Sequence, residues 1–177
     1  MLWCMRGHTP ARQTFWWDRT SDADVDPLRA VIFDFDDAVA DIDHDGELTP
    51  RSGLIDLMMS LFVAGVWVGV VSTKRRAEVE PLVRELIGDG LVETIVTSDD
   101  AESTDSTDLY RLALWEFGVG PESALAVVGS SAGLRTASDA GLATMVVSTD
   151  YEDFSNAAAC ERVHRRWWTE RKRAAAA

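Results

Sequence analysis

Short apolar runs rich in Val and Ile alternate along this chain with segments of helical spacing, and no other feature constrains the fold as strongly. Strands that are buried on both faces of a parallel sheet read as continuous apolar runs. Their alternation with helices predicts an α/β fold, in which helices cover a central parallel sheet. The predicted strands are 30–34, 67–72, 93–97, 124–128 and 144–148, and the predicted helices are 51–64, 75–87, 107–118 and 132–140.

One apolar stretch, residues 54–71, has the length of a membrane span. It contains Asp56, however, and Ala64 and Gly65 divide it into a helix-like half and a valine-rich half. We therefore interpret it as a buried helix followed by a buried strand. Gly stands at the expected end of this helix and of the three others, at positions 65, 88, 118 and 141.

Composition limits the class of partner. The 177-residue chain carries a net charge of −13, which argues against nucleic acid or a membrane as the main partner, because nucleic acids and anionic bilayers need a basic surface. Cys4 and Cys160 form neither a metal-binding spacing nor a C-x-x-C pair, so we expect reduced thiols in a cytoplasmic protein. The first residues lack the apolar core of a signal peptide.

Functional residues are expected where strands end, because ligands of open parallel sheets collect at the carboxyl ends of the strands. The first predicted strand ends in Asp34, and Asp36 follows it. One carboxylate of such a pair can attack phosphorus, and the other can protonate the leaving oxygen. The second strand leads into Ser72, Thr73 and Lys74, which offer hydroxyls and a cation to a phosphoryl oxygen.

Three stretches in register carry a family resemblance: VIFDFDDAVAD (31–41), VGVVSTK (68–74) and PESALAVVGSSAGLRTASDAGLATMVV (121–147). Together with STDYEDFSNAA (148–158) they resemble the haloacid-dehalogenase (HAD) superfamily of phosphohydrolases, and within it the β-phosphoglucomutase-like sugar-phosphate phosphatases. The resemblance implies a Rossmannoid three-layer sandwich. It also divides the chain into an aromatic and acidic extension (1–27), a HAD-like core domain (28–158) and a basic amphipathic helix (159–177).

The resemblance implies a role for each matching residue. Asp34 would be the nucleophile that forms an aspartyl-phosphate. Asp36 would be the general acid and base, with its backbone carbonyl on Mg²⁺. Ser72 and Thr73 would bind the phosphoryl group, and Lys74 matches a lysine that relatives often carry there.

The sequence departs from the family pattern at four positions. Asp37 and Ala38 stand where a small residue and a threonine are expected. Thr104 replaces the lysine that bridges nucleophile and phosphate, and Ser130 replaces a metal-binding acid. The site would thus lack one cation and one carboxylate, and removing one preorganised contact typically slows such chemistry on the order of 10²- to 10³-fold.

Compensation for these losses would come from neighbouring residues. Lys74, Arg75 or Arg76 could replace the cation, although five acids within 98–108 would repel a phosphate dianion. Asp37 is either a third metal ligand beside Asp34 and Asp36 or a product of relaxed selection, and we favour the second interpretation.

Residues 41–49, DIDHDGELT, resemble the first half of an EF-hand calcium loop, with Asp at positions 1, 3 and 5 and Gly at position 6. Position 12 is Ser52 instead of the usual Glu. The stretch is therefore either a weak Ca²⁺ site or an acidic turn in which Asp45 and Gly46 reverse the chain.

Only 35 residues separate Asp36 from Ser72, and this turn and one helix account for them. The helical cap of the family has no room there, so we expect a capless domain that takes large substrates or borrows a lid. Trp3, Trp16 and Trp17 could supply a lid or a homo-oligomer contact. The basic C-terminal helix is either a docking helix, whose Trp167 and Trp168 cover the sheet edge or the core, or a contact for a protein partner or an acidic surface.

Two functions stay open. The first is Mg²⁺-dependent hydrolysis of a phosphorylated substrate at a low rate, which the intact Asp34, Asp36 and Ser72 favour. The second is an inactive HAD-like regulatory module that binds a protein partner, which the lost cation and the lost acid favour.

Overall fold

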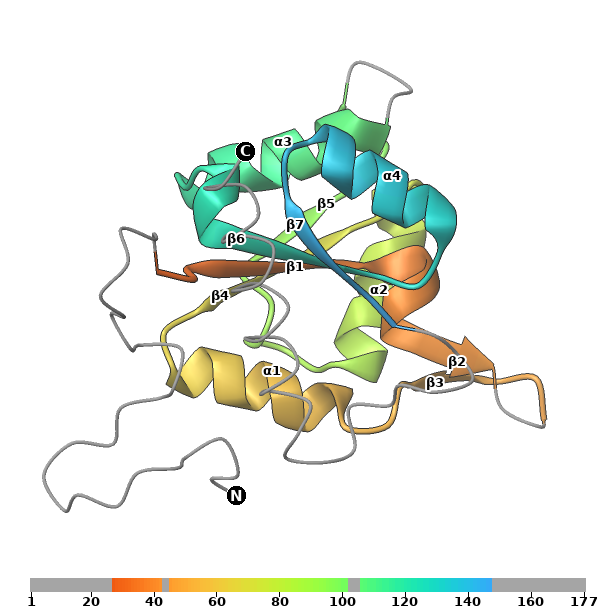
Figure 1. Cartoon of the computed structure of the whole chain (residues 1–177). Coiled ribbons are helices and arrows are strands. Elements are labelled where there is room, and N and C mark those ends of the chain that lie inside the picture. The colour runs from red at the N-terminus through yellow and green to blue at the C-terminus, as the bar shows by residue number, and fades with distance from the viewer. Residues whose placement is uncertain (1–26, 43–44, 102–105, 148–177) are drawn as a thin grey trace, which may run out of the picture.

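The computed structural model describes residues 27–42, 45–101 and 106–147. Its centre is a sheet of five parallel strands in the order β5-β4-β1-β6-β7 (Figure 1). The strands are β1 (Ala30–Asp34), β4 (Trp67–Val71), β5 (Thr94–Val96), β6 (Ala124–Val128) and β7 (Ala143–Val146). The α/β fold predicted from the sequence is confirmed, and the five strands lie where the apolar runs indicated.

Helices cover both faces of the sheet (Figure 1). Helices α1 (Leu54–Val63) and α2 (Arg76–Leu86) pack on one face, and α3 (Ser106–Phe117) and α4 (Ser131–Asp139) pack on the other. A short 3₁₀ turn, η3 (Pro121–Ser123), leads into β6. The predicted helices all form, with boundaries within three residues of those expected.

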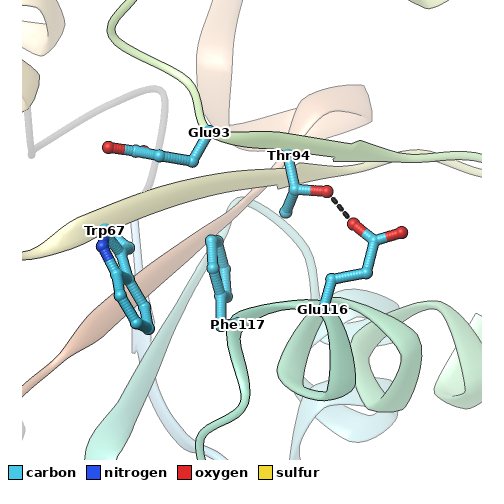
Figure 2. Close-up of a pocket in the computed structure, with 5 residues that line it drawn as sticks. All are labelled: Trp67, Glu93, Thr94, Glu116 and Phe117. Atoms are coloured by element: carbon cyan, nitrogen blue, oxygen red, sulfur yellow. Dashed lines mark hydrogen bonds between the residues drawn. The ribbon is translucent and has the colours of Figure 1, made fainter.

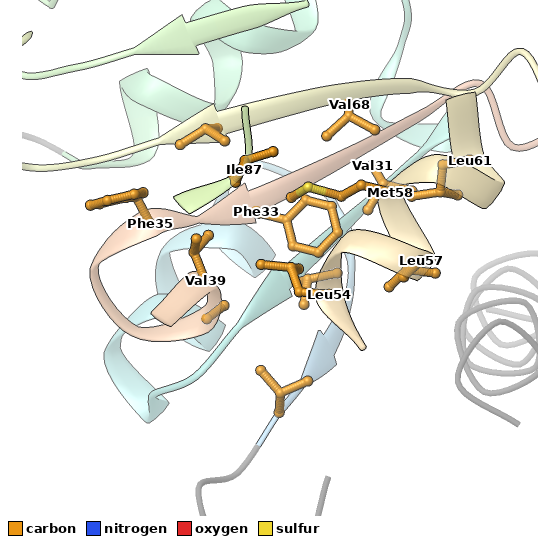
Figure 3. Packing of buried hydrophobic residues seen from close by; sticks show 14 of the residues in the cluster. Val31, Phe33, Phe35, Val39, Leu54, Leu57, Met58, Leu61, Val68 and Ile87 are labelled. Atoms are coloured by element: carbon orange, nitrogen blue, oxygen red, sulfur yellow. The ribbon is translucent and has the colours of Figure 1, made fainter. Parts of the chain in front are cut away.

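Strand β1 shows why both layers are needed. Val31 and Phe33 point into the layer shared with α1 and α2, whereas Ile32 points into the layer shared with α3. All three side chains are fully buried, and burying a side chain of this size contributes about 1.5–3 kcal/mol. Figure 3 shows the ring of Phe33 among the sheet-facing side chains of α1, which are Leu54, Leu57, Met58 and Leu61.

The apolar stretch 54–71 is α1 followed by β4, as interpreted from the sequence. Helix α1 ends at Val63, and Gly65, whose φ is +71°, follows its C-cap and donates its N–H to the carbonyl of Phe62. No helix among the described residues is both long and apolar enough to cross a bilayer. Helix α1 begins at Leu54 rather than at residue 51, because Gly53 in front of it adopts a left-handed conformation with φ +76°.

A π-helical turn and a small hairpin fill the rest of the connection between β1 and α1. The turn is η2 (Phe35–Val39), and β2 (Ala40–Ile42) and β3 (Leu48–Pro50) pair in antiparallel register. Gly46, with φ +83°, lies in the connection between the two strands. The chain therefore reverses at the predicted acidic turn. Asp43 and His44 lie outside the described residues, so the Ca²⁺ site stays a prediction.

The strand order fixes where a site can form. Strand β1 lies between β4 and β6, and all three run in the same direction. The segments that follow these strands therefore meet at one end of the sheet.

Candidate active site

A cleft of about 170 Å³ lies at the carboxyl ends of β1, β4 and β6. Its walls come from the end of β1 and the η2 turn, from the segment after β4, and from the first turns of α3 and α4. The structure thus brings together most of the site residues predicted from the sequence, namely Asp34, Asp36, Asp37, Ser72, Thr73 and Ser130. Ala38 is buried behind this wall, and Thr104 lies outside the described residues.

Asp34 is fixed by contacts from three elements. Its Oδ1 accepts the N–H of Asp36 at 3.1 Å, in the cap position of η2. The hydroxyl of Tyr110, on α3, donates to its Oδ2 at 3.4 Å. Gly133 lets α4 approach closely, because a Cβ there would lie 3.0 Å from Asp34 Oδ2. The carboxylate is therefore held in one place, as a nucleophile must be.

The surroundings of Asp34 disfavour its negative charge. Burial, followed by the negative charge of Asp37, raises the pKa of Asp34 to about 7. The N–H of Asp36 and the hydroxyl of Tyr110 oppose this shift without cancelling it. Burial and the nearby charge of Asp34 also raise the pKa of Tyr110, so its hydroxyl keeps the proton that it donates.

The carboxylate of Asp36 points toward the segment after β4. Its Oδ1 accepts the hydroxyl of Ser72 at 2.9 Å, and its Oδ2 accepts both the N–H and the hydroxyl of Thr73 at 2.9 Å. The ammonium of Lys74 lies 3.5 Å from Oδ1. We call these donors of Ser72, Thr73 and Lys74 the oxyanion cradle. They are arranged for an anion with several oxygens, and a carboxylate of the same chain fills them.

Asp37 joins the two loops on the other side of the cleft. Its Oδ1 accepts the N–H of Gly129 at 2.6 Å, and its backbone carbonyl accepts a hydrogen bond from the Arg51 guanidinium at 3.0 Å. A Cβ on Gly129 would lie 1.9 Å from the carbonyl oxygen of Asp37, so only Gly fits there. Arg51 also pairs with Asp41 at 3.2 Å, which ties the base of the hairpin to the cleft.

Ser130, where the family resemblance led us to expect a metal-binding acid, has a structural role. It is the N-cap of α4, and its Oγ accepts the N–H of Gly133 at 3.0 Å. Because Asp is an equally good N-cap residue, a carboxylate would be tolerated at this position.

The described part of the acidic segment after β5 is occupied with structural contacts. Asp100 accepts the N–H and the hydroxyl of Thr97, each at 2.8 Å, and the guanidinium of Arg76 at 2.7 Å. Asp99 accepts the backbone N–H of Arg76 at the start of α2. Arg76 therefore pairs with this loop, whereas Lys74 contacts a carboxylate of the cleft.

The donor set suits Mg²⁺, which prefers carboxylate, carbonyl and water oxygens. Asp34 and Asp37 place two carboxylates on the cleft, and among the described residues no basic side chain forms an ion pair with either of them. No group of three or more metal-binding side chains is found among the described residues. A bound Mg²⁺ would therefore also use backbone and water oxygens, as this ion usually does.

Three residues in or beside the cleft are not among the predicted site residues. Tyr110 lines the cleft and ends the stretch TDSTDLY (104–110) that begins at Thr104, but the sequence indicated no role for it. Arg51 and Gly129 gave no signal, because their roles depend on contacts with Asp37 from 14 and 92 residues away.

A second hollow, of about 270 Å³, lies at the opposite end of the sheet, lined by Trp67, Glu93, Thr94, Glu116 and Phe117 (Figure 2). Trp67 stacks on Phe117 with ring centroids 5.7 Å apart, and the guanidinium of Arg29 lies 5.6 Å from the Trp67 ring. Glu93 accepts a backbone N–H, and Glu116 accepts the hydroxyl of Thr94. Because these groups already have partners, we place the candidate site in the acidic cleft.

Comparison with known proteins agrees with the sequence motifs. Residues 12–147 match the family model of the haloacid dehalogenase-like hydrolases. Protein CbbY of Cereibacter sphaeroides is 38% identical over 120 residues, which are 64% of this chain and 52% of that protein. A CBBY-like protein of Arabidopsis thaliana is 33% identical over 113 residues, which are 60% of this chain and 35% of that protein. The chain thus spans about half, or less, of the length of these curated relatives.

Solved structures share the fold. CbbY from Rhodobacter sphaeroides in complex with phosphate superposes with a TM-score of 0.62 and 21% identity, over 72% of this chain and 95% of that one. A mutant of that CbbY in complex with xylulose-1,5-bisphosphate gives the same values. A HAD-superfamily hydrolase from Ehrlichia chaffeensis superposes with a TM-score of 0.65 and 14% identity, over 83% of this chain and 98% of that one.

Proposed function

The chain belongs to the haloacid dehalogenase-like hydrolase family, and on that premise we propose that it hydrolyses phosphomonoesters, with a sugar phosphate or bisphosphate as the substrate class. One observation carries the proposal: Asp34, Asp36 and the hydroxyls of Ser72 and Thr73 line a single cleft. The substrate class follows from the related CbbY, a mutant of which has been solved with xylulose-1,5-bisphosphate.

The reaction proceeds in two displacements. A carboxylate oxygen of Asp34 attacks phosphorus, an O–P bond forms, and the bond from phosphorus to the sugar oxygen breaks as Asp36 gives that oxygen a proton. A water then attacks the aspartyl-phosphate and passes a proton to Asp36, which releases phosphate and restores Asp34. The hydroxyls of Ser72 and Thr73 and the ammonium of Lys74 hold the transferring oxygens.

Substrate binding requires Asp36 to leave the oxyanion cradle. Its carboxylate fills the donors of Ser72 and Thr73, so an incoming phosphoryl group takes its place. The displaced side chain is then free to reach the leaving oxygen.

Mg²⁺, when bound, supplies positive charge that stabilises the transferring phosphoryl group. We propose that Asp34 and Asp37 hold it, with the backbone carbonyl of Asp36. This revises the interpretation of Asp37 as a product of relaxed selection. Its hydrogen bond to Gly129 places its carboxylate beside Ser130, where the family carries an acid.

We further propose a slow enzyme without a cap domain. The segment between β1 and β4 consists of η2, the hairpin and α1, so the cleft has no helical cover from this connection. Water then reaches the aspartyl-phosphate easily, and a small substrate is held by few contacts.

The first experiment measures Mg²⁺-dependent phosphate release from a panel of sugar phosphates and bisphosphates, with the wild type and Asp34→Asn prepared side by side. Turnover that disappears in the variant supports the proposal. Equal rates in both proteins would mean a contaminating phosphatase and would overturn it.

A second experiment tests Asp37 as the metal ligand. Asp37→Asn should weaken Mg²⁺ binding measured by calorimetry, and adding Ser130→Asp to it should restore binding, because the second change returns a carboxylate to the same place. Unchanged Mg²⁺ affinity in Asp37→Asn would contradict the assignment.

A second function is favoured by one specific observation. Asp36 satisfies the oxyanion cradle without any ligand, as expected of an inactive module that is retained to bind a protein. Absence of turnover across the panel, together with intact folding, would favour this alternative.

A further inference from the structure

The hairpin beside the cleft exposes apolar side chains that the fold does not use. Ile42 is 74% exposed and Leu48 is 46% exposed, and they are opposite each other in the β2–β3 register. The hairpin is also acidic, since residues 40–50 contain three Asp and one Glu and no Lys or Arg. Arg51 ties its base to Asp37 of the cleft. An apolar pair within an acidic rim is a surface for a basic, aromatic segment.

The chain contains one such segment. Residues 161–173 hold six basic and two acidic residues and the pair Trp167 and Trp168. Their net charge of +4 belongs to a chain whose total is −13, so the rest of the protein attracts them. Among acidic surfaces, the hairpin also offers apolar side chains to the two tryptophans.

The described fold ends close to this surface. The last described residue is Val147, and its N–H donates to the carbonyl of Val128 at 2.8 Å. Gly129, which follows Val128, contacts Asp37. The 13 residues between Val147 and position 161 can span roughly 40 Å when extended. Figure 1 shows β7 ending on the side of the molecule where the hairpin projects.

The described chain begins at the opposite end of the sheet. Arg29, which follows the first described residues, hydrogen-bonds to Ser123 and Trp67 at the amino ends of β6 and β4. The C-terminal segment is therefore the better occupant of the hairpin surface.

We propose that residues 161–173 dock on the β2–β3 hairpin of the same chain, with Trp167 and Trp168 on Ile42 and Leu48. The docking itself does not depend on catalysis.

The two cysteines provide the test, since Cys160 directly precedes the segment and Cys4 lies near the other terminus. A nitroxide spin label is placed on Cys160 in a Cys4→Ser background, and amide signals of the ¹⁵N-labelled full chain are recorded. We expect the signals of Ile42 and Leu48 to lose most of their intensity. The matched control carries the label on Cys4 in a Cys160→Ser background and should leave these signals unchanged.

Two further arms identify the contact. The double variant Arg165→Glu/Arg166→Glu should restore the hairpin signals, as should ~1 M salt, where the screening length is about 3 Å. Arg12→Glu/Arg19→Glu makes the same charge change near the other terminus and should not restore them.

Three results would overturn the proposal: unchanged hairpin signals with the Cys160 label, equal losses from the Cys4 label, or losses that occur only when labelled and ¹⁵N-enriched copies are mixed. The last result would assign the contact to a second copy of the chain. Because none of these readouts uses turnover, failure of the proposed enzymatic function leaves the outcome interpretable.

Discussion

Asp34 ends β1 and Asp100 follows β5 at the same end of the sheet, yet their pKa values move in opposite directions. Burial acts to raise the pKa of each. At Asp34 the charge of Asp37 adds to that effect, and the pKa reaches about 7. At Asp100 the N–H and hydroxyl of Thr97 and the guanidinium of Arg76 outweigh burial, and the pKa falls below its usual value. Within the described part of the chain no cationic side chain pairs with Asp34, whereas Arg76 pairs with Asp100.

The difference shows that an acidic stretch has no single meaning. In the sequence, residues 34–45 and 98–108 look alike because both are rich in Asp. In the structure, the described acids of 98–108 include Asp99 and Asp100, which bind Arg76 at the start of α2. The stretch 34–45 instead places three carboxylates on the wall of a cleft. Clustered negative charge without local compensation is the arrangement that functional sites tend to have.

The largest expected effect separates the two carboxylates by activity. Asp34→Asn should lower phosphate release by a factor on the order of 10³ or more, because the attacking oxygen is lost. Asp108→Asn, on a partly exposed acid of α3 that pairs with Arg111, is the matched control and should keep full activity. Turnover that survives in Asp34→Asn would contradict the role of Asp34 as the nucleophile.

The next effect concerns stability without metal. Because the folded pKa of Asp34 is raised to about 7 from 3.8, its ionised form is disfavoured in the fold, and the wild type should lose stability as the pH rises from about 4 to about 7. Asp34→Asn should therefore be more stable than the wild type by about 2–4 kcal/mol at pH 8. Below pH 4 the gain should vanish. Urea denaturation in EDTA at both pH values measures it, and a variant no more stable than the wild type at pH 8 contradicts the prediction.

Asp100 should behave in the opposite way. Asp100→Asn should lower the free energy of unfolding by about 1–2 kcal/mol at pH 7, because a charged acceptor of hydrogen bonds from Thr97 and Arg76 is lost. With a folded pKa below 3.8, its contribution is present above that value and fades as the pH falls through the lower folded pKa. Denaturation at pH 7 and near pH 2 tests this, and a loss of the same size at both pH values would count against it.

The smallest effect calibrates the scale. Arg84 of α2 pairs with Glu80 one turn earlier and with Asp89 beyond the end of the helix, each at 3.2 Å, at the protein surface. Arg84→Gln should change the free energy of unfolding by less than about 0.5 kcal/mol, because exposed ion pairs contribute little. A loss of unfolding free energy as large as that of Asp100→Asn would contradict this prediction. It would mean that the number of partners, rather than their burial, determines how much such a charged residue stabilises the fold.

The fold was predictable because local patterns determine it. The apolar runs predicted β1 and β6 residue for residue, and the helical spacing located all four helices. The η2 turn was not predicted, since its five residues form a rare π-helical turn without a sequence signal. The early start assigned to α1 was wrong because Gly53 holds a left-handed turn in front of the helix.

The site was predictable only in part. Strand-end logic brought Asp34, Asp36 and Ser72 to one place, because a parallel sheet gathers its carboxyl ends. The contact of Asp37 with Gly129 and the filling of the oxyanion cradle by Asp36 depend on side-chain directions across tertiary contacts. Periodicity and spacing carry no information about those directions.

The central place of β1 has a consequence for how the molecule opens. Its backbone pairs with β4 from Ala30 to Asp34 on one side and with β6 from Ala30 to Phe33 on the other, so its amide protons should exchange with solvent only when the whole domain unfolds. Strands β5 and β7, at the sheet edges, can separate earlier. The base of the cleft would then be the last part of the sheet to exchange in deuterated water. Local fraying of the edge strands would therefore not separate Asp34 from the negative charge of Asp37.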